Sequence, residues 1–300
     1  MNVPVEAELL IPPPRKRAVV TGGTGYIGRH LVDHLTETGT HVTVLTRQTL
    51  ESTSSVTYVR IDGSLQSMTD ALAVARPHSV VHLAASYVRI HTLSDLPRLL
   101  EANVGLGMML IEAMKQAEVA NLVLAGSYFQ RTGRTPGVPR SLYAATKNAF
   151  EDILEFYESD GAIIATRLTI CDVYGEDDTR GRLMNVLAEA TRSGNPVRVP
   201  KSDVYVAPVH ISDVARAFEL AIRLKSSQVA RYWVGPSSSI LVSEVVRIFE
   251  RLSGTAVRLE QTDIQTLPGD DTPLVPGEPL PGWQLEVGLE AGVARLLDAL

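Results

Sequence analysis

The sequence predicts an α/β protein of the Rossmann type, a doubly wound parallel sheet with a smaller C-terminal substrate-binding lobe. In the first half of the chain, short apolar runs alternate with segments of helical periodicity. The first apolar run ends in a glycine-rich turn, and the pattern loosens after about residue 175. We therefore expect an N-terminal extension over 1–16, a Rossmann domain over 17–175 to which some later elements return, and a mainly substrate-binding lobe over 176–300.

The elements follow from these patterns in order. Apolar runs with the length of buried parallel strands lie at 18–20, 42–45, 56–61, 80–83, 122–124 and 162–168. Helical spacing of apolar residues predicts helices at 27–38 and 95–117, and later at 181–193, 212–225 and 242–252. Two short strands are expected near 203–209 and 230–235, and a final helix from residue 286. The proline-rich stretch 267–282 is typical of an ordered loop that wraps around a fold.

Composition and charge argue against several classes of protein. The 300 residues carry a formal net charge of −6, so the chain lacks the positive field on which nucleic-acid binding relies. The single cysteine, Cys171, excludes an intrachain disulfide, and the histidines show no metal spacing. No apolar stretch approaches the ~18–20 residues of a membrane span, and no secretory signal is evident. We expect a cytoplasmic protein without metal, nucleic-acid or membrane partners.

The glycine turn predicts dinucleotide binding. Three glycines recur at intervals of three residues between the first strand and the first helix. Glycine lets the backbone approach a pyrophosphate closely, and the helix N-terminus supplies free N–H donors. The alternative is a tight turn without a ligand. The expected cofactor contacts are Gly22, Thr24, Gly25, Tyr26, Ile27 and Gly28.

The end of the second strand favours NADP over NAD. An acidic residue there would bind the ribose 2′-hydroxyl of NAD, but this chain has Thr46 and Arg47. A guanidinium suits a 2′-phosphate, although Arg47 could equally be a solvated residue at a strand end. Asp62, after the third strand, either accepts a hydrogen bond from the adenine amino group or serves a turn or helix cap.

A tyrosine and a lysine predict acid–base chemistry. Tyr143 and Lys147 are spaced i, i+4, on one face of a helix. A nearby ammonium lowers the pKa of a phenol, so Tyr143 could exchange protons near neutral pH. Ser127 follows the fifth strand, at the carboxyl edge where ligands bind, and could donate to a substrate oxygen. His82 and Cys171 are interpreted as buried core residues.

Together these motifs resemble the extended short-chain dehydrogenase/reductase superfamily, which contains nucleotide-sugar epimerases, dehydratases and ketoreductases. The stretches that carry the resemblance are 21–28, 82–85, Asn103, Ser127, 143–147, 209–215 and 281–283. The resemblance implies a catalytic triad of Ser127, Tyr143 and Lys147, with Lys147 also holding the nicotinamide ribose. It further implies that Ala84 lies near the cofactor and that Asn103 supports the central helix or a catalytic water.

Departures from the family pattern narrow the expected reaction. Ser127 is followed by Tyr128 and Phe129 instead of the acidic pair of dehydratases. The missing acids favour a reductase. In its short segment between Ser127 and Tyr143, the chain resembles the deoxysugar 4-ketoreductases. Val206 replaces an arginine for the substrate pyrophosphate, for which Arg180 or Arg182 could substitute.

The sequence therefore predicts an NADP-dependent reductase that acts on a 4-keto group of a nucleotide-linked deoxyhexose. Ser127, Tyr143 and Arg182 are its expected substrate contacts, and we expect a homodimer. One alternative is a nucleotide-sugar epimerase that uses the same triad. The other is a non-catalytic NADP-binding sensor.

Overall fold

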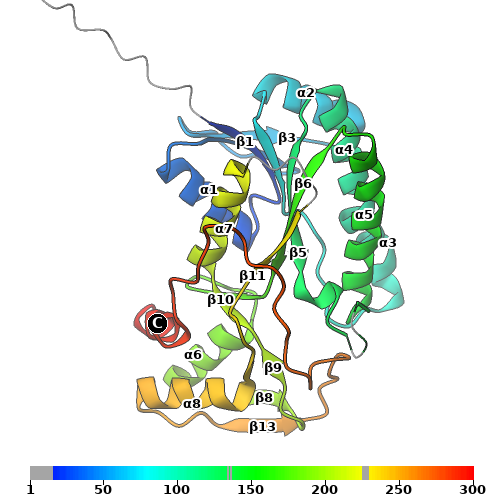
Figure 1. Ribbon diagram of the computed structural model, residues 1–300. Helices are drawn as coiled ribbons and strands as arrows, with labels where there is room; N and C mark the ends of the chain where they lie inside the picture. Colours follow the sequence, from blue (N-terminus) through cyan, green and yellow to red (C-terminus); the bar gives the residue numbers. More distant parts are fainter. Residues whose placement is uncertain (1–15, 134, 136, 225–229) are drawn as a thin grey trace, which may run out of the picture.

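The protein is described here by a computed structural model covering residues 16–133, 135, 137–224 and 230–300, so the expected extension lies almost wholly outside the described residues. A seven-stranded parallel sheet forms its centre (Figure 1). In spatial order its strands are β11 (Ala230–Val234), β6 (Ile164–Ile170), β5 (Asn121–Ser127), β4 (Ser79–His82), β1 (Arg17–Thr21), β2 (His41–Thr46) and β3 (Val56–Arg60). The strand order confirms the predicted doubly wound Rossmann-type sheet.

Helices cover both faces of this sheet (Figure 1). On one face, α1 (Tyr26–Glu37) and α7 (Ile211–Arg223) pack together. On the other face lie α2 (Leu65–Ala75), α4 (Leu106–Gln116) and α5 (Leu142–Ser159). Each face has its own buried core of aliphatic side chains. The apolar strands are buried on both faces, which explains their near-continuous hydrophobic runs.

The strand order reverses between β1 and β4, which are direct neighbours although far apart in sequence. Connections leave the two strands in opposite directions, so a crevice opens at their carboxyl ends. The glycine turn follows β1, and β5 with Ser127 at its end lies next to β4. This topology places the candidate cofactor and catalytic residues at one edge of the sheet.

A smaller lobe lies at the carboxyl edge of the sheet (Figure 1). Its helices are α6 (Leu183–Ser193), α8 (Val242–Ser253) and α9 (Leu289–Asp298), which share a separate core. Three two-stranded sheets complete it: β7 (Asp172–Tyr174) with β10 (Pro208–His210), β9 (Tyr205–Val206) with β12 (Ile240–Leu241), and β8 (Val197–Pro200) with β13 (Leu259–Thr262).

Chain beyond residue 175 returns to the central layer through β11 and α7. Asp213, at the start of α7, accepts hydrogen bonds from the backbone N–H groups of Glu286 and Val287, at 3.1 and 3.0 Å. The indole N–H of Trp283 donates to the carbonyl oxygen of Asp213 at 2.9 Å. These bonds join the two C-terminal motifs that the sequence singled out, and they fasten the C-terminal segment to α7.

Two parts of the sheet layer differ from expectation. The helix expected at 95–117 is made of η1 (Leu93–Asp95), α3 (Leu96–Leu100), a π-helical turn η2 (Glu101–Gly105) and α4. The π turn lets Asn103 turn inward and bond both backbone groups of Ser86. Helix α2 was not predicted from the sequence, although Ser64 caps it by accepting from the N–H of Ser67.

Candidate active site

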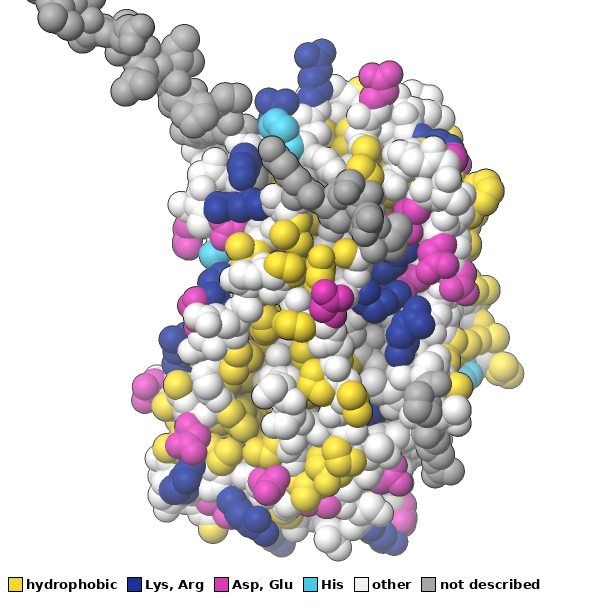
Figure 2. Space-filling model, in the orientation of Figure 1, with side chains coloured by type: hydrophobic (Ala, Val, Ile, Leu, Met, Phe, Trp, Pro, Cys, Tyr) yellow, Lys and Arg dark blue, Asp and Glu magenta, His cyan; other side chains and the backbone are white. Residues whose placement is uncertain are grey.

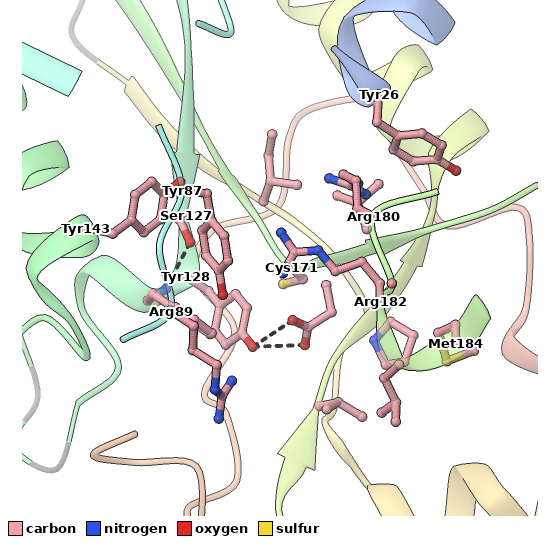
Figure 3. Close-up of a pocket in the computed structure, with 18 of the residues that line it drawn as sticks. Tyr26, Tyr87, Arg89, Ser127, Tyr128, Tyr143, Cys171, Arg180, Arg182 and Met184 are labelled. Carbon is pink, nitrogen blue, oxygen red and sulfur yellow. Dashed lines mark hydrogen bonds between the residues drawn. The ribbon is translucent and has the colours of Figure 1, made fainter. Parts of the chain in front are cut away.

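A cleft of about 650 Å³ opens at the carboxyl edge of the sheet and extends to the smaller lobe. Hydrophobic side chains are prominent across the middle of the face seen in Figure 2. Figure 3 shows the cleft: Tyr143, Tyr87 and Ser127 lie on one side, and Arg180, Arg182 and Met184 on the other. One side is built from loops of the sheet and the other from the lobe, as in enzymes that bind a cofactor and a substrate in one crevice.

The glycine turn has the geometry of a phosphate site. Gly22 adopts φ +71°, and a side chain there would lie 2.6 Å from the backbone nitrogen of Ala84. A Cβ on Gly28 would lie 2.1 Å from the carbonyl oxygen of Gly22, so helix α1 can approach the strand only with glycine at this position. Gly25 is the N-cap of α1 and brings no side chain to the helix N-terminus. The first N–H groups of α1 therefore point to open space at the cleft, where they can bind an anion.

The cleft is lined by most, but not all, of the residues predicted to contact the cofactor or the substrate. The predicted residues that line the cleft are Gly22, Gly25, Tyr26, Ile27, Gly28, Ser127, Tyr143, Lys147 and Arg182. The predicted cofactor contacts outside its lining are Thr24, Arg47, Asp62 and Ala84. Asp62 has a capping role, since its carboxylate accepts from the backbone of Ser64 and the hydroxyl of Ser67. Those hydrogen bonds lower the pKa of Asp62.

Helix α5 and strand β5 bring the triad together. Ser141 caps α5 by accepting from the N–H of Ala144, which places Tyr143 in the first turn and Lys147 one turn later. Asn103 donates at 3.0 Å to the hydroxyl of Thr146, which itself donates to the carbonyl oxygen of Tyr143. Asn103 therefore ties the loop after β4 to helix α5, which holds Tyr143 and Lys147.

Burial dominates the electrostatics of the site. It raises the pKa of Tyr143, with a further increase from Tyr87, and the one cation that opposes this is Arg182. Burial lowers the pKa of Lys147 to about 8, while the nearby carboxylate of Glu151 favours the charged form. The expected lowering of the Tyr143 pKa by Lys147 is not found. Desolvation raises that pKa instead, and the phenol stays protonated.

An aromatic stack links the candidate catalytic tyrosine, Tyr143, to an arginine. The ring of Tyr87 lies edge-on to that of Tyr143, and the guanidinium of Arg182 lies 4.3 Å from the centroid of the Tyr87 ring. Three other arginines at the cleft each pair with a carboxylate: Arg89 with Asp270, Arg180 with Asp178, and Arg198 with Glu260. Among the described ion pairs, Arg182 takes part in none. Among the arginines that line the cleft, it is therefore the one most available to an incoming anion.

Two acidic side chains at the cleft were not predicted. The hydroxyl of Tyr128 donates at 2.9 Å to both carboxylate oxygens of Asp172, and burial raises the pKa of Asp172. Asp270 bonds the buried guanidinium of Arg140 and also Arg89. Neither Asp172 nor Asp270 lies in a recognisable sequence motif. The position of Asp172 two residues after the end of β6, at the carboxyl edge, was the available signal.

The two residues expected in the core are there. His82 is 3% exposed, bonds the Thr21 hydroxyl at 2.7 Å, and has a pKa lowered to about 3 by burial and by Lys147. Cys171 is buried at the floor of the cleft, and burial raises the pKa of its thiol. Neither is placed as an acid or a base at neutral pH.

The described residues contain neither a candidate metal site nor a candidate membrane-spanning helix. Over residues 16–133, 135, 137–224 and 230–300, no three His, Cys, Asp or Glu side chains are grouped to hold a metal ion. No helix in the same part of the chain combines the length and hydropathy that a membrane crossing requires.

This fold and site define a Rossmann-type enzyme with a phosphate-binding turn and a Tyr–Lys pair in one cleft. Residues 18–235 match the NAD dependent epimerase/dehydratase family, and the chain belongs to that family. It is therefore an oxidoreductase or epimerase that uses a pyridine nucleotide, and the resemblance to the extended short-chain dehydrogenase/reductase superfamily is confirmed. A curated relative, CDP-abequose synthase of Yersinia pseudotuberculosis, is 27% identical over 209 residues, which is 67% of this chain and 71% of that protein.

Solved structures agree with this placement. MoeE5 in complex with UDP-glucuronic acid and NAD superposes with a TM-score of 0.81 and 27% identity, over 94% of this chain and 98% of that chain. UDP-glucose 4-epimerase of Thermus thermophilus in complex with NAD has a TM-score of 0.80 and 26% identity over the same shares. The chain is thus similar along nearly its whole length to nucleotide-sugar enzymes of known structure.

Proposed function

We propose that the protein is an NADP-dependent reductase of a 4-keto group on a nucleotide-linked deoxyhexose. The observation that carries the proposal is the placement of Ser127, Tyr143 and Lys147 in one cleft with the phosphate-binding turn. When bound, the cofactor supplies a hydride to the carbonyl carbon. Tyr143 gives its proton to the carbonyl oxygen, Ser127 orients that oxygen by a hydrogen bond, and the Lys147 ammonium stabilises the phenolate that remains.

The protonated phenol of Tyr143 is compatible with a reduction, which needs a proton donor when the carbonyl oxygen becomes basic. A dehydration would need acids beside the catalytic hydroxyl. Here Tyr128 and Phe129 follow Ser127, and the cleft acid Asp172 is bonded to Tyr128.

Arg182 supports a substrate with a diphosphate. It lies across the cleft from Ser127 (Figure 3), at the N-cap of α6. A guanidinium and the free N–H groups of an adjoining helix N-terminus suit a diphosphate anion. The similarity to CDP-abequose synthase is in line with a nucleotide-linked sugar.

The choice of NADP rests on the residues after β2. Arg47 is exposed directly after that strand, and no acid occupies the position that would bind a ribose 2′-hydroxyl. The structural relatives named above contain NAD, so NAD is the competing cofactor.

The experiment follows reduced nicotinamide during turnover. Purified protein is supplied with a nucleoside-diphosphate-linked 4-keto-deoxyhexose and either NADPH or NADH. Stoichiometric loss of the reduced-nicotinamide absorbance, with one alcohol formed per cofactor oxidised, supports the proposal. Binding of cofactor without turnover of any such substrate would instead favour a non-catalytic NADP-binding protein.

An epimerase is the second candidate, favoured by the likeness to UDP-glucose 4-epimerase. It would use the same triad in both directions, since Tyr143 would first accept and then return a proton. An epimerase regenerates its cofactor in every cycle. Conversion of a UDP-hexose to its 4-epimer with no net change in cofactor absorbance would establish this second function and exclude the first.

We also propose a homodimer formed through α4 and α5, which lie side by side on an outer face (Figure 1). Large apolar side chains are exposed there, with Phe156 69% and Met109 43% accessible. Exposed apolar patches on a helix pair are typical of subunit interfaces. Sedimentation of wild type and Phe156→Glu tests this: the variant should be monomeric, and a monomeric wild type would exclude the dimer.

A further inference from the structure

A buried hydrogen-bond network connects strand β5 to helix α5 behind the candidate triad. Its central members are Gln130, in the 3-10 turn η3 (Tyr128–Gln130), and Glu151 of α5. The exposed fractions are 1% for each residue. Buried polar side chains of this kind are costly unless every one is bonded, so their arrangement is fixed by the fold.

Gln130 joins the backbone of Ser127 to helix α5. Its side-chain oxygen accepts from the N–H of Ser127 at 2.7 Å. Its amide nitrogen donates to Glu151 Oε1 at 2.8 Å and to Asn148 Oδ1 at 3.0 Å. Asn148 in turn donates to the carbonyl oxygen of Gln130 at 3.0 Å. The side chain therefore makes three hydrogen bonds: one within the turn after β5, to Ser127, and two to α5.

Glu151 is held by cations from two other segments. Arg231 of β11 donates to both of its carboxylate oxygens. Arg131, just after η3, has a guanidinium nitrogen 3.7 Å from Oε2. Burial alone would raise the pKa of Glu151, but Arg231 and Gln130 hold it below its usual value. Glu151 is therefore a fixed anion one helical turn beyond Lys147.

Gly126 makes room for this network. A Cβ at Gly126 would lie 3.1 Å from the side-chain oxygen of Gln130 and 3.6 Å from Oε1 of Glu151. The contact with Gln130 is tighter than ordinary van der Waals packing. The residue before Ser127 thus permits the close approach of both side chains.

We propose that Gln130 and Glu151 are positioning residues for the triad: Gln130 sets the placement of Ser127, and Glu151 keeps the Lys147 ammonium charged. This deepens the proposed function and rests on it. Neither residue needs to touch substrate or cofactor. Their effects would reach the reacting groups through Ser127 and Lys147.

The charges around Lys147 are consistent with that role. Tyr143 on its own helix is neutral, and His82 from β4 is kept neutral by burial and by Lys147 itself. Arg231 from β11 and Arg167 from β6 are cations close to Glu151. Among the described neighbours of Lys147, Glu151 is the anion whose charge raises the lysine pKa. Its removal would leave a desolvated ammonium without that anion.

The first test is the pH profile of Glu151→Gln, which keeps the shape and removes the charge. Without the carboxylate, the Lys147 ammonium is less stable and loses its proton at lower pH. The alkaline limb of kcat/KM, expected near pH 8 in the wild type, should move down by about one pH unit or more. The exposed Glu155→Gln on the same helix is the matched control and should leave the limb in place.

Arg231→Gln tests the same charge through its partner. It removes the cation that keeps the buried Glu151 carboxylate ionised, so Glu151 should take up a proton more readily and the alkaline limb should again move to lower pH. A purely structural role for Glu151 would lower the rate in both variants at every pH and leave both limbs where they are. That outcome would overturn the assignment of Glu151.

Gln130→Met removes both the acceptor for Ser127 and the donor to Glu151 at nearly constant volume. We expect kcat to fall about tenfold or more, because a small displacement of a catalytic group lowers the rate of the reaction more than it lowers the affinity for ligands. The Kd for NADPH should stay the same, and the exposed Gln66→Met on α2 should be without effect. An unchanged kcat in Gln130→Met would remove Gln130 from the proposal.

A direct titration separates this proposal from the proposed reaction. The signal of Lys147 in protein labelled with ¹³C-lysine is identified by its loss in Lys147→Met, and its pKa is followed by NMR without substrate. A lower pKa in Glu151→Gln supports the inference even if no sugar is turned over. An unchanged pKa would overturn it even if the reductase activity is found.

Discussion

The ring of Tyr87 packs edge-on against the ring of Tyr143, with 4.9 Å between the centroids and 72° between the planes. The guanidinium of Arg182 lies over the same Tyr87 ring in a cation–π contact. One aromatic side chain therefore contacts both the proposed proton donor and the proposed anion-binding residue. Tyr87 and burial raise the pKa of Tyr143 while Arg182 opposes them. An anion that neutralises Arg182 would strengthen the hold of the phenol on its proton.

Tyr143→Phe should abolish most turnover and leave the fold intact. The ring and its contact with Tyr87 remain, but the proton donor is lost. General acid catalysis typically contributes ~10²–10⁴-fold, and kcat should fall by that order. NADPH binding, measured by fluorescence titration, should be unchanged. Near-full activity in this variant would show that Tyr143 is not the acid.

Arg182→Met should weaken nucleoside-diphosphate binding and spare the cofactor. A charge-assisted hydrogen bond is worth about 1.5–3 kcal/mol, so the Kd should rise roughly ten- to a hundredfold by calorimetry. The exposed Arg192→Met at the other end of α6 is the matched control. Equal Kd values in wild type and Arg182→Met would exclude Arg182 as a diphosphate ligand.

The sheet layer could be predicted because its signals are local. Each buried parallel strand is a short apolar run, and the glycines around Gly22 and Gly28 mark the first turn wherever the rest of the chain lies. Ser127 could be placed at the carboxyl edge because it follows a strand of the predicted parallel sheet. For the same reason, residues 18–20 and 42–45 were assigned to strands that the structure extends by only one or two residues.

The network behind the triad could not be predicted, because it joins residues far apart in sequence. Glu151 meets Arg231 across 80 positions, and Arg140 meets Asp270 across 130. Helix α2 and the π turn at Asn103 were missed for another reason. Periodicity does not distinguish a π turn from continuous helix, and tertiary bonds to Ser86 decide the local geometry.

Asp213→Asn should destabilise the attachment of the C-terminal segment. Asp213 is fully buried and accepts from the N–H groups of Glu286 and Val287. An asparagine has one acceptor oxygen, so one of these donors loses its partner, at a cost of about 1–3 kcal/mol. Urea unfolding followed by Trp fluorescence measures this change. Asp33→Asn, exposed on α1, serves as the control, and equal unfolding midpoints in the two variants would contradict the role of Asp213.

Arg47→Ala should weaken NADPH and leave NADH nearly unchanged, because NADH has no 2′-phosphate to lose. Loss of a charge-assisted bond predicts a roughly ten- to a hundredfold higher Kd for NADPH. Arg47 is exposed, so the preference of the wild type for NADPH should also shrink at high salt. Arg76→Ala is the matched control, because Arg76 lies outside the cleft lining. Arg29 on α1 is also exposed, but it donates to the Asp177 carbonyl oxygen near the glycine turn and is therefore unsuitable as a control.

Titration of both cofactors into wild type and Arg47→Ala separates the remaining outcomes. Equal weakening of NADPH and NADH would mean that Arg47 acts on the adenosine part that both share. A wild type that prefers NADH would overturn the NADP assignment. It would also favour the epimerase, because an enzyme that retains and regenerates its cofactor gains nothing from selecting the 2′-phosphate.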